Sequence, residues 1–234
     1  MNKSELKTAL ENHDIVLTDD VYDKLEKVLE NTIKTNESFN LTSITNPEDF
    51  REKMIYDSII GLSLLKKEER TCIDIGTGAG FPGLPLAICN STNNYVLLDS
   101  TKKKIDYIQK FVDEEHISNV ITVNDRVENY ARNNRNKFDY AFARAVAHLS
   151  ILIETIVPLL KVGGEFIAFK GKNAEQEIKE SKNALKKLGC SIKLSKYEVL
   201  PFSKEERYLV VITKNEETNK KYPRDYSLIV SKPL

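Results

Sequence analysis

The pattern of apolar and polar positions divides the chain into three parts. Apolar side chains follow helical spacing over residues 4–12 and 19–35, and Pro47 begins a third helical stretch that runs to about Leu65. After Thr71, short apolar runs alternate with amphipathic segments, which is typical of parallel strands joined by helices. The end of the chain is polar and should be loosely held. We therefore predict an N-terminal helical extension (1–65), an α/β domain (66–214) and a polar C-terminal tail (215–234).

The alternating region predicts strands and helices in regular succession. The predicted strands cover residues 71–75, 94–98, 119–123, 138–143, 163–169, 191–199 and 207–213. The predicted helices lie near residues 82–90, 101–115, 126–133, 147–161 and 173–188. The last two strands are separated by a loop around Pro201 and should therefore pair antiparallel. We expect a seven-stranded, mostly parallel sheet that closes with this hairpin, which a dinucleotide-binding domain normally lacks.

A glycine-rich turn follows the first predicted strand. Gly76, Gly78 and Gly80 alternate along the chain, and Phe81-Pro82-Gly83 comes next. Glycines at a strand-to-helix turn let a ligand lie directly against the backbone. The third glycine comes one residue earlier than in the G-x-G-x-x-G motif, and Pro82 lacks the N–H that a phosphate would use. The spacing favours an adenosine-bearing cofactor without a pyrophosphate, such as S-adenosylmethionine, over a packing turn that binds no ligand.

Acidic and polar residues follow the next strands. Asp99 ends the second strand, where it is suited either to bind ribose hydroxyls or to cap the helix near Thr101. Asp74 lies inside the first strand and would orient the glycine turn, accept from the amino group of a methionine, or serve a structural role. Backbone groups of Val127 and Glu128 should read the adenine edge, although an ordinary helix start explains these residues nearly as well.

The fourth predicted strand ends in Arg144 and indicates the chemistry of the methyl acceptor. No Asn/Asp-Pro-Pro-aromatic motif is present to hold an exocyclic amine, and no cysteine nucleophile stands near this strand exit. Guanine N7 has a free lone pair and needs only alignment, and Arg144 can bind guanine or a nearby phosphate. A salt-bridged structural role is the alternative. Further cations are expected near the same rim, where they would either bind phosphates or lie on solvated helix faces. They are Lys102, Lys103, Lys104, Lys170, Lys172 and Arg207.

The composition restricts the remaining choices. Lysine plus arginine and aspartate plus glutamate each number 35, so any attraction to nucleic acid must be local. The 3 cysteines have no metal or disulfide spacing and the histidines are isolated, which predicts no metal site and a reducing cytoplasm. We expect neither a membrane span nor a secretory leader.

Nearly the whole chain resembles the RsmG family, also called GidB, of bacterial 16S ribosomal RNA (guanine-N7) methyltransferases. The segments that carry the resemblance are Asn40–Ile44, Asp57-Ser58, Ile73–Gly83, Leu97–Ser100, Arg126–Glu128, Arg144-Ala145, Lys170-Gly171, Leu209–Ile212 and Tyr222–Arg224. The resemblance implies a Rossmann-like class I methyltransferase fold. By that resemblance the cofactor would contact Gly76, Gly78, Gly80, Phe81, Asp99, Val127, Glu128 and Arg144. The positions that match those presented to RNA or to the target base are Lys103, Arg126, Arg144, Lys170 and Arg207, of which Arg144, Lys103 and Arg126 are the candidate catalytic residues.

This resemblance implies methyl transfer from S-adenosylmethionine to N7 of one guanosine in small-subunit rRNA. We expect in-line displacement without a metal, by a monomer. We expect weak activity on naked RNA, since N7 is hidden in stacked helices. The alternatives are a non-catalytic RNA-binding assembly factor and a methyltransferase for a small molecule or protein. Three segments depart from the family pattern, and none is predicted to touch the cofactor pocket: Thr35-Asn36 in place of Trp-Asn, Met54 in place of a histidine, and Asp225–Val230 in place of Gly-Thr-Pro-Asn-Lys.

Overall fold

A single mixed sheet organises the computed structural model, which describes residues 1–234. The strands are β1 (Thr71–Ile75), β2 (Asn94–Asp99), β3 (Val120–Asn124), β4 (Phe138–Arg144), β5 (Leu160–Lys170), β6 (Cys190–Val199) and β7 (Glu206–Lys214). Their order is β3-β2-β1-β4-β5-β7-β6, and β7 is the one strand that runs in the opposite direction to the others. The predicted seven-stranded sheet with a closing hairpin is confirmed. The order reverses between β1 and β4, which is where open α/β sheets bind ligands.

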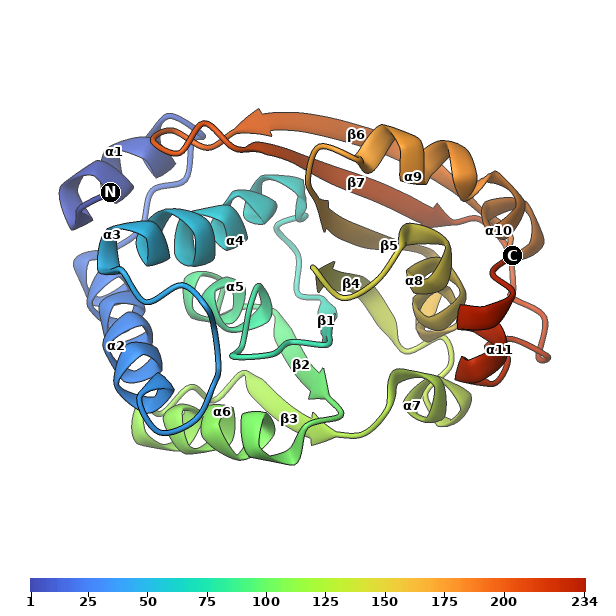
Figure 1. Cartoon of the computed structure of the whole chain (residues 1–234), viewed down its shortest axis with the longest axis horizontal. Helices are drawn as coiled ribbons and strands as arrows, with labels where there is room; N and C mark the ends of the chain where they lie inside the picture. Colours follow the sequence, from blue (N-terminus) through green and yellow to red (C-terminus); the bar gives the residue numbers. More distant parts are fainter.

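Helices cover both faces of the sheet (Figure 1). The connecting helices are α5 (Gly83–Cys89), α6 (Lys102–Glu114), α7 (Val127–Asn133), α8 (Leu149–Ile156), α9 (Ala174–Glu180) and α10 (Lys182–Lys187). Helices α5 and α6 pack on one face and α7 to α10 on the other, so the β1 and β4 side chains between them are buried. None of the helices is both long and apolar enough to span a bilayer.

Two predicted helices are shorter than expected. The predicted helix 147–161 ends at Ile156 and continues as the 3₁₀ turn η3 (Val157–Leu159), because Pro158 cannot donate a helical hydrogen bond. The predicted helix 173–188 breaks at Ser181, whose buried hydroxyl donates to the Glu177 carbonyl at 2.7 Å. A serine that bonds back to its own helix in this way bends it.

The N-terminal helices share a core with the α5 and α6 face. They are α1 (Lys3–Glu11), α2 (Asp19–Asn36), α3 (Pro47–Phe50), the π-turn η1 (Arg51–Tyr56), α4 (Asp57–Ile59) and the 3₁₀ turn η2 (Ile60–Leu64). The Phe50 ring packs edge-to-face on Phe81 at 5.5 Å, and the Thr32 and Tyr107 hydroxyls lie 2.7 Å apart. The extension therefore places a π-turn, a feature common at functional sites, beside the carboxyl edge of the sheet.

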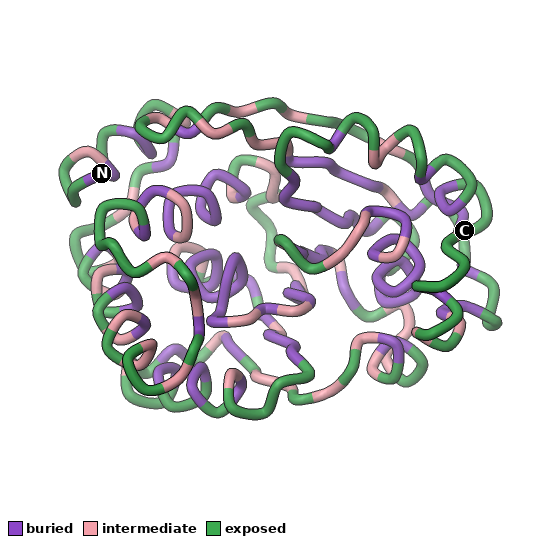
Figure 2. The backbone as a smooth tube through the Cα atoms, in the orientation of Figure 1, coloured by how far each residue is buried: buried purple, intermediate pink, exposed green.

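The C-terminal tail is held firmly, and the expectation of a loose tail is wrong. Arg224 donates to both carboxylate oxygens of Glu154 on α8, and Glu154 is fully buried. The short helix α11 (Tyr226–Ser231) buries Ile229 and lies beside α7 and α8 (Figures 1 and 2). These partners stand far away in sequence, so local polarity did not reveal them.

Candidate functional site

The glycine turn closes tightly over the ends of β1 and β2. Gly76, Gly78 and Gly80 all have left-handed backbone angles, with φ of +67°, +61° and +100°. The Gly76 N–H donates to the Leu98 carbonyl at 2.8 Å, which ties the turn to β2. Side chains at these positions would strain the backbone, so the three glycines are required by the geometry of the turn itself.

Asp74 organises the turn from beneath. Its Oδ2 accepts from the Thr77 hydroxyl at 2.6 Å and from the Gly83 N–H at 2.9 Å. The first N–H of α5 is thus engaged by a carboxylate, which leaves it unavailable to a pyrophosphate, as the early third glycine also indicated. Burial raises the pKa of Asp74 to about 6, and its Oδ1 atom is buried without a hydrogen-bond partner.

A cavity of about 330 Å³ opens at the strand ends, and we call it the strand-end cavity. Predicted residues in its wall are Gly76, Asp99, Arg126, Val127 and Glu128. Gly78, Gly80, Phe81 and Arg144 were also predicted to contact the cofactor, but they do not line this cavity. The sheet's parallel topology brings the ends of β1 to β4 together here, as expected for a ligand site at the switch point.

Asp99 accepts hydrogen bonds on both carboxylate oxygens, while the N-cap of α6 is Thr101 and not Asp99 itself. Its Oδ2 accepts from the Gly78 N–H at 2.9 Å, and its Oδ1 accepts from the Thr101 N–H at 2.8 Å. Each carboxylate oxygen has a second lone pair, so both can still accept from ribose hydroxyls. Asp99 therefore links the glycine turn to the start of α6 while lining the strand-end cavity.

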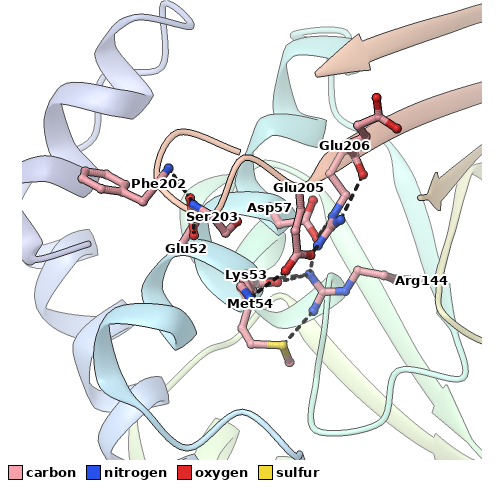
Figure 3. A network of polar contacts seen from close by, with 10 residues as sticks. Glu52, Lys53, Met54, Asp57, Arg144, Phe202, Ser203, Glu205 and Glu206 are labelled. Atoms are coloured by element: carbon pink, nitrogen blue, oxygen red, sulfur yellow. Dashed lines mark hydrogen bonds and ion pairs between the residues drawn. The ribbon is translucent and has the colours of Figure 1, made fainter. Parts of the chain in front are cut away.

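Arg144 is buried and ion-paired at the end of β4. Its guanidinium lies 3.3 Å from Asp57 Oδ2 and donates to the Lys53 carbonyl at 3.2 Å (Figure 3). It also donates to the Ser58 hydroxyl at 3.2 Å and lies 5.6 Å from the Phe81 ring centre. Burial lowers the pKa of Arg144, and the Asp57 charge opposes this shift. The salt-bridged structural role proposed as the alternative is therefore present in the structure.

Arg144 also lines a second cavity of about 670 Å³, which we call the arginine cavity. Asp57, Lys170 and Arg207 belong to its wall. Ala145 and Val146 line both cavities, so the segment after β4 separates the arginine cavity from the strand-end cavity. The two cavities therefore adjoin on either side of this segment.

The predicted basic rim is partly neutralised by carboxylates, which pair with Lys102, Lys170 and Arg207 but not with Lys103, Lys104 or Lys172. Lys170 is only 9% exposed and donates to Glu177 at 2.7 Å, while Arg207 contacts Asp57 at 3.2 Å and Glu205 at 2.8 Å. Lys103, in contrast, is exposed on α6 and makes no ion pair. Of the predicted RNA-binding residues, only Lys103 presents an unpaired charge.

Sequence reasoning assigned no role to two buried carboxylates of the N-terminal extension. Asp57 lies between the Arg144 and Arg207 guanidiniums, and its Oδ1 has no hydrogen-bond partner. Glu52 Oε1 accepts from the backbone N–H groups of Phe202 at 2.6 Å and Ser203 at 3.0 Å, which fastens the β6–β7 loop to η1 (Figure 3). Asp57 belongs to a segment that carries the family resemblance, whereas Glu52 shows no such signal.

The C-terminal departure from the family pattern was not expected to touch the cofactor pocket, but it supplies a residue to the strand-end cavity. Tyr226 of α11 lines the strand-end cavity, and its ring centre lies 6.0 Å from the Arg126 guanidinium carbon. Arg126 in turn approaches Glu128 Oε1 at 3.6 Å. The tail therefore completes a wall that otherwise comes from the strand ends.

No cluster of three or more His, Cys, Asp or Glu side chains is arranged to bind a metal.

Comparison with known proteins places the chain in a family. The sequence profile described as rRNA small subunit methyltransferase G, that of the GidB family, matches residues 21–210. The chain belongs to the GidB family. It is 40% identical over 233 residues to ribosomal RNA small subunit methyltransferase G of Fusobacterium nucleatum, covering 99% of this chain and 100% of that protein. It is 38% identical over 240 residues to the same-named protein of Limosilactobacillus reuteri, covering all of both chains.

Solved structures agree with this membership at the level of the fold. M. jannaschii TYW2 in complex with AdoMet matches with a TM-score of 0.57 at 15% identity, covering 77% of this chain and 80% of that one. A SAM-dependent methyltransferase from Aquifex aeolicus matches with a TM-score of 0.54 at 16% identity, covering 77% of this chain and 98% of that one. The GidB family depends on S-adenosylmethionine, so the protein is a methyltransferase that uses this cofactor.

Proposed function

We propose that the protein transfers the methyl group of S-adenosylmethionine to N7 of one guanosine in 16S rRNA. The observation that carries this assignment is the pair of cavities separated by Ala145 and Val146. The strand-end cavity suits the cofactor, and the arginine cavity suits a nucleotide with its phosphate. Membership in the GidB family over most of the chain supports the same reaction and substrate.

The residues of the strand-end cavity fit the cofactor. Asp99 holds the ribose through its remaining lone pairs, and the backbone of Val127 and Glu128 reads the adenine. The glycine turn from Gly76 to Gly80 leaves room for the methionine part. Asp74 does not line this cavity but lies beneath the glycine turn, and its buried, unpartnered Oδ1 is an acceptor suited to the methionine ammonium group. S-adenosylmethionine, when bound, supplies an electrophilic methyl group.

The reaction requires alignment more than acid–base help. The N7 lone pair forms the new bond as the sulfur–methyl bond breaks, and the electron pair of that bond stays on sulfur, giving S-adenosylhomocysteine. N7 carries no proton, so no general base is needed. Arg144 holds the guanine or its phosphate so that N7 is aligned with the methyl group. Lys103 and Arg126 contact the RNA beside the cofactor. Lys170 and Arg207 bind phosphate by exchanging their carboxylate partners.

The finer parts of the proposal concern the setting of the reaction. The protein acts as a monomer in this proposal. The substrate is small-subunit rRNA presented in the subunit or in an assembly intermediate, and the reaction takes place in the cytoplasm. We retain the division into an extension (1–65), a methyltransferase domain (66–214) and a C-terminal tail (215–234) as part of this proposal.

The direct test is to map N7-methylguanosine by borohydride and aniline cleavage in rRNA from cells with and without the gene. One cleavage site should disappear when the gene is deleted and return when it is restored. If the cleavage pattern is identical in both strains, the proposed reaction is wrong. If the purified protein binds S-adenosylmethionine but methylates only a small molecule or protein, the RNA assignment fails.

Charge reversal at Lys103 tests the RNA contact. Lys103→Glu should raise the KM for the small subunit several-fold, because an exposed unpaired cation becomes an anion, while the affinity for S-adenosylmethionine stays unchanged. Lys110→Glu is the matched control, since Lys110 is exposed on the same helix and pairs locally with Glu114. Equal KM values for the two variants would remove Lys103 from the RNA-binding surface. Arg207 is less suitable, because a glutamate there would face Asp57.

A further inference from the structure

The strand-end cavity has one wall residue that comes from a distant part of the chain. Its other lining residues belong to the ends of β1 to β4 and the segments that follow them. Tyr226, by contrast, stands in the first turn of α11, close to the C-terminus. The side chain is half-buried and adds an aromatic ring to a cavity that is otherwise lined by polar and aliphatic groups.

The tail holds Tyr226 in place through anchors on both sides. The Arg224 side chain donates to Glu154 at 2.7 Å and 2.6 Å, and the Arg224 backbone N–H donates to the same carboxylate at 3.0 Å. Asp225 pairs with Arg132 of α7 at 2.6 Å. Ile229, one turn further along α11, is fully buried. The ring is therefore fixed before any ligand arrives, and its ordering costs little when the ligand binds.

A second planar group lies beside this ring. The Arg126 guanidinium carbon is 6.0 Å from the Tyr226 ring centre, and Arg126 also contacts the buried Glu128 at 3.6 Å. Aromatic rings and guanidinium groups both stack on purine bases. Figure 1 shows α11 beside α7, whose first residues are Val127 and Glu128, the proposed readers of the adenine edge. The cavity thus offers edge contacts from the backbone and a face contact from Tyr226.

We propose that Tyr226 is a cofactor-binding residue that stacks on the adenine ring of S-adenosylmethionine, with the Arg126 guanidinium packed near the tyrosine ring. This inference rests on the proposed cofactor site and adds to it a contact from the C-terminal tail. The tail then connects the adenine subsite to α8, because Arg224 is bound to Glu154 of that helix.

Calorimetric titration of the full-length protein with S-adenosylmethionine tests the contact. Tyr226→Ala should weaken binding roughly 10- to 100-fold, the range expected for the loss of one base–aromatic stack. Tyr226→Phe keeps the ring and should bind within about twofold of the wild type. Tyr226→Leu keeps bulk without a π-face and should be weakened as well, which covers the case in which the alanine variant folds poorly. Titration with adenosine should show the same ranking, because the contact is to the base.

Tyr197→Ala is the matched control, because Tyr197 is an exposed tyrosine on β6 that lies outside the strand-end cavity. If the wild type binds S-adenosylmethionine and Tyr226→Ala and Tyr226→Leu bind it equally well, the inference is overturned while the proposed function stands. If the wild type does not bind S-adenosylmethionine, the proposed function itself fails. If Tyr226→Ala raises only the KM for RNA, the ring contacts RNA and the inference is also overturned.

Discussion

Replacing Asp57 with asparagine keeps the size of the side chain and removes the negative charge between two guanidinium groups. Asp57 Oδ2 lies 3.3 Å from the Arg144 guanidinium and 3.2 Å from that of Arg207. The exposed fractions are 3% for the Asp57 side chain, 11% for Arg144 and 19% for Arg207. The substitution therefore leaves two poorly solvated cations beside each other without their shared anion.

The size of the effect follows from what each arginine keeps. Breaking a buried ion pair by removing one partner costs about 3–5 kcal/mol. Arg207 retains Glu205, and Arg144 retains the carbonyl groups of Lys53 and Met54, so the loss should fall at the lower end of that range. We expect Asp57→Asn to lower the free energy of unfolding by about 3 kcal/mol.

Urea unfolding at pH 7, followed by circular dichroism, measures this loss. Asp23→Asn is the matched control, because Asp23 pairs with Lys3 on the surface, where both side chains are largely exposed. The control should cost less than about 1 kcal/mol. In the folded variant, kcat should fall because Arg144 is no longer held in place, while the affinity for S-adenosylmethionine should not change. If Asp57→Asn lowers the free energy of unfolding no more than the control does, and kcat is unchanged, then Asp57 does not position Arg144.

Two further predictions concern other buried carboxylates. The folded-state pKa of Asp74 is raised from 3.8 to about 6, so ionisation of this one group lowers the free energy of unfolding of the wild type by an amount on the order of 3 kcal/mol as the pH rises through this window. Asp74→Asn cannot ionise, so its unfolding free energy relative to the wild type should increase between pH 4 and pH 7; a constant difference would contradict the raised pKa. Arg224→Ala leaves the fully buried Glu154 without its partner and should cost about 3–5 kcal/mol in urea unfolding. Arg132→Ala removes an exposed pair of the same tail and should cost at most about 1 kcal/mol; equal losses would mean that the Arg224 pair does not anchor the tail.

Local periodicity was enough to predict the architecture. The alternation of apolar runs and amphipathic helices predicted all seven strands within a few residues, and the Pro201 loop predicted the antiparallel hairpin. The glycine spacing and Pro82 indicated the class of cofactor, because the backbone angles at a tight turn depend on the residues of that turn alone. The break at Ser181 was missed, since a serine bends a helix only when its hydroxyl bonds back to the chain.

Only the tertiary structure decided which charged residues pair with one another. The sequence placed Arg144 and Arg207 at the rim but did not show that Asp57 joins them, because these residues are 87 and 150 positions apart from it. For the same reason, the polar tail gave no sign that Glu154 would anchor Arg224 and bring Tyr226 to the strand-end cavity. Hydrophobic periodicity is a property of neighbouring residues and can be read directly from the sequence. The pairing of buried charges depends on which distant segments the fold brings together, and so it became visible only in the structure.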